Sequence, residues 1–232
     1  MINPYEEQIA GHDIRVDAEI NQEERTPCLL LIDVSGSMNQ QGKIDQINEG
    51  LKSFEAAIKA DATTASRVVV SVVIFGTKQD NVQIVEDWTD AEYFVAPTLT
   101  AWGKSPMGEA VDFALQRIES IKEYLVEEEI NYKRPWIFLL SDGGPTDEDW
   151  YECAQRASAA VDAKKVMIWA LVTDPGDPEG LRPFVGTGSE DHNEVYAIDG
   201  AALKEMFQWL STSLGADACG DAPVAPGKVA TG

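Results

Sequence analysis

The sequence predicts an α/β fold, in which a doubly wound, mostly parallel sheet with one antiparallel edge strand carries helices on both faces. Short apolar runs, typical of buried strands, alternate along the chain with segments whose apolar residues recur every three or four positions. One run, at 81–88, is more polar and alternating, which suits the edge of a sheet. The length of 232 residues is enough for one domain of this class.

The strands are predicted at 27–33, 67–75, 81–88, 136–141, 166–173 and 194–198. Helical periodicity predicts helices at 44–58, from Pro106 to about 125, from about 150 to 164, at 178–185 and at 203–214. Residues 89–105 form a long connection without periodicity, and connections of this length are usually functional or mobile.

Composition divides the chain into three parts. Residues 1–25 are polar and acidic, and we expect them to form an N-terminal arm over the domain surface. Residues 26–214 carry the alternating strands and helices of the domain. Residues 215–232 are rich in Gly, Ala, Pro and Asp, which predicts a flexible C-terminal tail.

The charge balance narrows the range of partners. Forty acidic residues against 18 basic ones give a formal net charge of −22, so a basic patch for nucleic acid is not expected. Apolar stretches are too short to span a bilayer, and the N-terminus lacks the features of a signal peptide. Three cysteines at wide spacings fit neither a disulfide framework nor a zinc site. These observations predict a cytoplasmic protein with no nucleic-acid or membrane partner.

Oxygen-bearing side chains gather where two predicted strands end. The apolar run 29–32 is followed by Asp33, Ser35 and Ser37, and the run 137–141 is followed by Asp142. In doubly wound sheets the ligand site lies beyond the carboxyl ends of the strands. Carboxylate and hydroxyl oxygens are hard ligands that suit Mg²⁺ or Mn²⁺. The residues therefore predict a divalent-cation site at this edge.

The segment Asp33-Val34-Ser35-Gly36-Ser37 resembles the D-x-S-x-S element of von Willebrand factor type A domains, which opens their metal-ion-dependent adhesion site. The family adds a Thr before a later helix and an Asp at the end of a central strand. Ser105 and Asp142 stand at these places, and the resemblance covers about residues 26–214. It implies that Asp33, Ser35, Ser37, Ser105 and Asp142 hold Mg²⁺ or Mn²⁺, with Asp142 binding directly or through a water.

A narrower similarity links the chain to the bacterial TerY-like group, which is associated with tellurium resistance and stress operons. It lies in residues 25–28, in 134–138, in the turn after Asp142 and in 207–211. This resemblance implies a role in a bacterial stress or tellurium-resistance system. Ser105 departs from the Thr of that group, but serine keeps the hydroxyl that coordination needs.

Together these features predict a metal-dependent protein–protein interaction module rather than an enzyme, because the sequence shows no nucleophile–base pair with an orienting partner. A protein partner is expected to supply an Asp or Glu carboxylate to the metal. Two alternatives stay open at this point. One is a Mg²⁺- or Mn²⁺-dependent phosphoester hydrolase that uses the same site, and the other is a chelatase-like subunit that docks on an ATPase.

Overall fold

The computed structural model describes residues 14–18, 21–79, 81–173, 176–188, 194–198, 205–206, 208–209 and 212–213. Its centre is a six-stranded sheet in the order β3-β2-β1-β4-β5-β6. The strands are β1 (Thr26–Asp33), β2 (Val68–Phe75), β3 (Val82–Asp90), β4 (Trp136–Ser141), β5 (Met167–Thr173) and β6 (Val195–Ile198). Strand β3 pairs with β2 in the antiparallel sense, and the other strand pairs are parallel.

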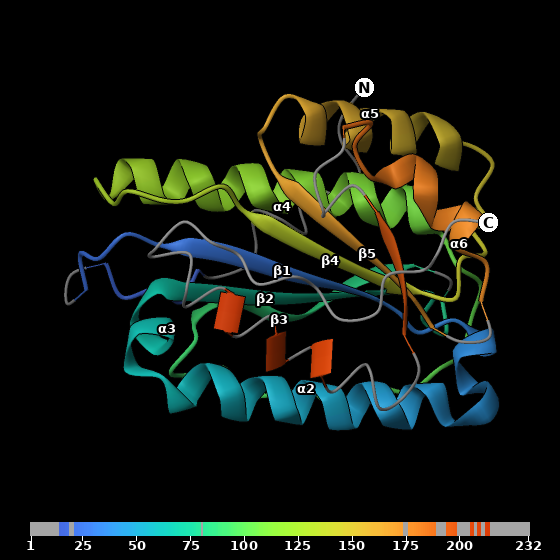
Figure 1. Cartoon of the computed structure of the whole chain (residues 1–232), viewed down its shortest axis with the longest axis horizontal. Coiled ribbons are helices and arrows are strands. Elements are labelled where there is room, and N and C mark those ends of the chain that lie inside the picture. The colour runs from blue at the N-terminus through green and yellow to red at the C-terminus, as the bar shows by residue number, and fades with distance from the viewer. Residues whose placement is uncertain are drawn as a thin grey trace.

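Helices cover both faces of this sheet, with α4 and α5 on one face and α2 on the other (Figure 1). The longer helices are α2 (Lys43–Ala60), α4 (Met107–Glu127) and α5 (Trp150–Asp162). Shorter elements are η1 (Gly36–Gly42), α3 (Ala62–Arg67), α6 (Pro178–Leu181) and η2 (Arg182–Phe184). The predicted fold class is therefore confirmed, including the antiparallel strand at the sheet edge.

Two apolar cores explain why the strand sequences are almost continuously apolar. Leu29 and Leu31 of β1 belong to the core under α4 and α5, whereas Leu30 and Ile32 belong to the core under α2. Successive side chains of a strand point to opposite faces, so a strand covered on both sides must be apolar at every position.

The chain order places the carboxyl ends of β1 and β4 beside each other. From β1 the chain continues to β2 on one side, and α4 later carries it back to β4 on the other side. The strand order thus reverses between β1 and β4, which is where doubly wound folds bind ligands. Ile32 pairs with Leu140, so Asp33 and Ser141 are the next residues on the two strands.

Some predicted boundaries need correction. Pro106 is the N-cap of α4 and not its first helical residue. The helix predicted at 44–58 begins at Lys43, and a 3₁₀ turn that was not predicted, η1, precedes it. The described part of the N-terminal arm packs closely, since Val16 and Ala18 join the core under α4 and α5.

At the C-terminal end, residues 205–206, 208–209 and 212–213 are helical, in agreement with the predicted closing helix. The tail predicted at 215–232 lies outside the described residues, as do residues 1–13 of the predicted arm. Among the described helices, none has the length and hydropathy needed to cross a membrane.

Candidate metal centre

Backbone hydrogen bonds join three loops at the carboxyl end of the sheet. Gly36 N donates to Gly103 O at 2.8 Å, and Trp102 N donates to Val34 O at 2.7 Å. Gly103 N in turn donates to Gly76 O, directly after β2, at 2.9 Å. The turn after β1, the end of β2 and the loop before α4 are therefore held together by the backbone itself, independently of any ligand.

Asp33 lies at the centre of this arrangement. Its carboxylate accepts three hydrogen bonds: from Ser35 N to Oδ1 at 2.7 Å, from Ser105 Oγ to Oδ2 at 2.9 Å, and from Ser141 Oγ to Oδ2 at 2.6 Å. The register of β1 and β4 explains the contact with Ser141, which is the neighbour of Asp33 across the two strands. The site thus has two elements that the sequence predicted, Asp33 and Ser105, in direct contact.

The electrostatics of Asp33 are unusual for an acid. Its side chain is completely buried, and no lysine or arginine of the described residues forms an ion pair with it. Burial raises the pKa of the Asp33 carboxyl, although hydrogen bonds from Ser141, Ser35 and Ser105 oppose that rise. A nearby cation would stabilise the charged form of such a carboxylate.

The predicted hydroxyl ligands surround the same carboxylate. Ser35 and Ser105 are buried, Ser37 is half-buried, and the Oγ atoms of Ser35 and Ser37 lie 3.1 Å apart. Ser105 donates its proton to Asp33, so the lone pairs of its oxygen stay free to bind a cation. Hydrogen bonds therefore connect Asp33 with Ser35 and Ser105, and Ser35 with Ser37.

Asp142 lies at the end of the adjoining strand and has a different partner. Its Oδ2 atom is 3.4 Å from Nζ of Lys43, the first residue of α2. Ser141 connects it to the centre, because Ser141 Oγ bonds Asp33 and also accepts from Gly143 N at 3.1 Å. Lys43 and Ser141 were not predicted as part of the site. The pairing register of two parallel strands, had it been known, would have indicated Ser141.

The predicted ligands can be compared with the needs of a divalent cation. Within the described ranges, no three His, Cys, Asp or Glu side chains converge on a common point. The two carboxylates and three hydroxyls predicted as ligands offer oxygen atoms only, and oxygen donors suit hard divalent cations. The buried, unpaired charge of Asp33 is the feature of this structure that a bound cation would compensate.

The turn after β4 holds Ser105 in place. Thr146 N donates to Ser105 O at 2.8 Å, and Asp147 Oδ2 accepts from Glu109 N, in the first turn of α4, at 3.0 Å. Asp147 therefore satisfies a backbone N–H in the first turn of α4, which favours a structural role for this acid. Thr100, another hydroxyl-bearing residue of the loop 89–105, is exposed and accepts a hydrogen bond from Trp102 Nε1 at 2.8 Å.

Ser105→Ala is expected to weaken Mn²⁺ binding by about 1 kcal/mol or more, the scale of one lost polar contact. Ser105→Thr keeps the hydroxyl and is expected to bind Mn²⁺ at least as well as the parent. Calorimetric titration of both variants checks this pair of results. Undiminished binding by Ser105→Ala would remove Ser105 from the ligand set.

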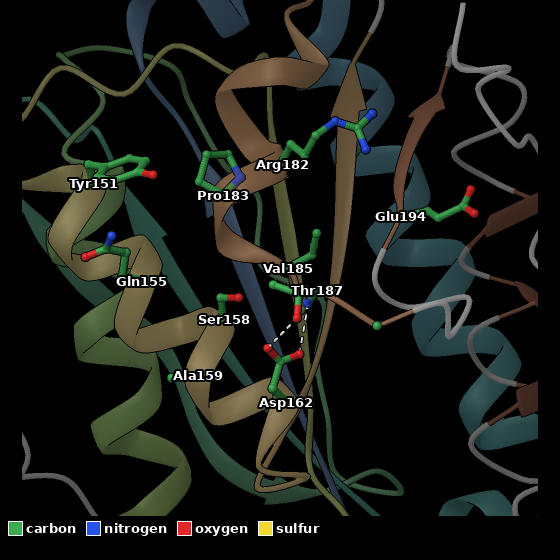
Figure 2. Close-up of a pocket in the computed structure, with 12 residues that line it drawn as sticks. Tyr151, Gln155, Ser158, Ala159, Asp162, Arg182, Pro183, Val185, Thr187 and Glu194 are labelled. Carbon is green, nitrogen blue, oxygen red and sulfur yellow. Dashed lines mark hydrogen bonds between the residues drawn. The ribbon is translucent and has the colours of Figure 1, made fainter.

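A surface pocket lies beside α5 (Figure 2). Its volume is about 770 Å³, and its lining includes Tyr151, Gln155 and Arg182. Asp162 and Glu194 are the acids in its lining. Asp162 accepts hydrogen bonds from Thr187 N at 2.9 Å and Thr187 Oγ1 at 2.8 Å, which lower the pKa of that carboxyl. The Asp162 carboxyl therefore differs from that of Asp33, whose pKa is raised by burial.

Solved structures share the fold of this chain. The open form of the pilus adhesin SpaC from Lactobacillus rhamnosus GG superposes with a TM-score of 0.66 at 13% identity, over 85% of this chain and 31% of that one. The vWF domain of the pili tip protein Mfa5 from Porphyromonas gingivalis gives 0.61 at 12% identity, over 90% and 99%. Manganese-loaded TRAP from Plasmodium vivax gives 0.54 at 16% identity, over 80% and 74%.

These similarities establish that the chain has the von Willebrand factor type A fold. It spans about a third of the SpaC chain and nearly the whole Mfa5 domain. No protein-family model matches the sequence, and no curated protein matches it either. The narrower resemblance to the TerY-like group receives no support from these structures.

Proposed function

We propose that this protein is a metal-dependent protein interaction module, with one Mg²⁺ or Mn²⁺ held at the Asp33 centre. The observation that carries the proposal is the completely buried Asp33 carboxylate, which has hydroxyl neighbours and no basic partner among the described residues. Asp33, Ser35, Ser37 and Ser105 would hold the ion, with Asp142 close by. Both the manganese in TRAP and the adhesin role of SpaC agree with a cation-dependent contact.

The chemistry of the centre favours an acidic group on the partner. Neutral hydroxyls add no negative charge, so a bound dication would keep enough positive charge to attract a further carboxylate. The loop 89–105 and the turn 143–149 border the centre and would form the rim of the contact. Trp102 on this rim is 57% exposed, although its backbone is fixed by Val34, and exposed aromatic side chains often anchor protein interfaces.

The proposal has narrower parts that the structural neighbours do not address. A cytoplasmic location and a role in tellurium resistance or stress stay hypotheses based on sequence, and the pilus proteins among the neighbours do not support them. The absence of enzymatic activity is likewise part of the proposal.

The test is capture of a partner from an extract of the source organism by the immobilised full chain. We expect a protein that is retained in Mg²⁺, released by EDTA and not retained by an Asp33→Ala column. Substituting the acidic residues of the captured protein one at a time should identify one whose loss prevents retention. Retention that is indifferent to EDTA and to Asp33→Ala would contradict the proposal.

A phosphatase assay with a simple aryl phosphate separates the module from a hydrolase. We expect no turnover above background in Mg²⁺ or Mn²⁺. Turnover that is lost in Asp33→Ala would contradict the interaction module. It would indicate a metal-dependent phosphoester hydrolase instead.

A further inference from the structure

Lys43 is an unusual lysine, because it is buried and because it begins a helix. Its side chain is only 6% exposed, whereas lysines are rarely buried unless they have a partner. As the first residue of α2, it also places a positive charge at the positive end of the helix dipole. Neither position is favourable for the helix, so the reason for this residue must lie in its surroundings.

The chain takes a strained path to bring Lys43 to this place. Gln41 and Gly42 both have left-handed backbone conformations, with φ values of 54° and 72°. Glycine adopts this conformation readily, but for glutamine it costs conformational energy. The left-handed end of η1 therefore precedes the start of α2, from which Lys43 reaches Asp142 at the carboxyl end of β4.

The surroundings supply a partner on the metal centre itself. Lys43 Nζ lies 3.4 Å from Asp142 Oδ2, and the Asp142 side chain is only 13% exposed. Low exposure strengthens the attraction between the two charges, because little water screens them. Asp142 thus has a cation beside it in the protein's own structure, whereas Asp33 has none among the described residues.

We infer that Lys43 is an internal counter-cation that keeps Asp142 out of direct metal coordination. The inference rests on the proposed function, since it concerns how the same centre holds its ion. With Asp142 paired to Lys43, the Asp33 carboxylate and the serine hydroxyls would be left to hold the ion. Lys43 therefore lowers the affinity for the metal, and it preserves positive charge at the centre for the carboxylate of a partner.

A double-mutant cycle measured with Mn²⁺ alone tests this role. Dissociation constants are determined by calorimetry for the parent, Lys43→Met, Asp142→Asn and the double variant. Lys43→Met removes a unit positive charge beside the ion but keeps a long apolar side chain, so we expect binding about tenfold tighter. The loss of affinity caused by Asp142→Asn should be at least about tenfold larger in the Lys43→Met background, because Asp142 can bind the ion directly only there.

The control is Lys52→Met, which removes the same charge from an exposed position of α2. It should leave the Mn²⁺ affinity within about twofold of the parent, because exposed charges are screened. Melting curves in EDTA give a second readout. Lys43→Met should melt below the parent because Asp142 loses its partner, and Mn²⁺ should raise its melting temperature more than it raises that of the parent.

Lys43→Gln, which can still donate a hydrogen bond to Asp142, serves if Lys43→Met does not fold. A parent-like Mn²⁺ affinity of the Lys43 variants would overturn this inference but not the proposed metal centre. An equal loss of affinity on Asp142→Asn in both backgrounds would do the same. Undiminished Mn²⁺ binding by Asp33→Ala would instead overturn the proposed metal centre, so the two failures are distinguishable.

Discussion

Asp33→Ala is expected to abolish Mn²⁺ binding while the domain stays folded. Asp33 is the carboxylate on which the hydroxyls of Ser105 and Ser141 converge, so its loss removes the main charge that holds a cation. The substitution also removes a charge that is costly to bury, which offsets part of the lost hydrogen bonding. Calorimetry measures binding, and circular dichroism with thermal melting in EDTA measures the fold.

Glu123→Ala is the matched control for Asp33→Ala. It changes the net charge of the chain by the same amount, but the acid that it removes is exposed on α4. Its Mn²⁺ affinity should equal that of the parent. Asp33→Asn adds an isosteric variant that keeps the shape of the side chain but not its charge. If either Asp33 variant titrates like the parent, the assignment of the centre is wrong.

Gly76→Ala is expected to weaken Mn²⁺ binding at least about tenfold and to destabilise the domain by about 1–3 kcal/mol. Gly76 follows β2 with a φ of 79°, a conformation that suits glycine. An added Cβ would lie 2.7 Å from Lys104 O and 2.9 Å from Ser35 N, both of which are backbone atoms. The methyl group would therefore force apart the two loops that carry Ser35 and Ser105.

Gly144→Ala provides the comparison, since an added Cβ there meets nothing within 4 Å although the residue follows Asp142 closely. It should change neither the Mn²⁺ affinity nor the midpoint of urea unfolding. An affinity of Gly76→Ala equal to that of Gly144→Ala would show that the two ligand loops are not coupled through Gly76.

Much of the fold could be predicted from local sequence. Leu29 to Ile32 are apolar at every position because both faces of β1 are covered, and the alternating β3 lies at the edge as expected. The 3₁₀ turn η1 could not be predicted, because it depends on left-handed backbone at Gln41, which is rare outside glycine. The cap at Pro106 differs by one residue, which is the usual uncertainty of a helix boundary.

The site residues that follow the ends of strands could be predicted from the sequence. The contacts that depend on packing could be predicted less well. Asp33 and Asp142 could be placed at one edge because the carboxyl ends of parallel strands meet there. The contact of Ser141 with Asp33 depends on the register of β1 and β4, which the sequence alone does not determine. Lys43 and Asp142 are 99 positions apart in the sequence. Their contact depends on the backbone turn at Gln41 and Gly42, which the sequence analysis did not predict.

The most direct test of the metal centre is a crystal structure of the full chain grown in Mn²⁺, with anomalous diffraction recorded at the manganese edge. The proposed centre predicts one strong anomalous peak per chain, about 2.0–2.3 Å from oxygens of Asp33, Ser35, Ser37 and Ser105. A peak held by other groups, such as the acids of the turn 143–149, with Asp33 still bonded only to Ser35, Ser105 and Ser141, would contradict it.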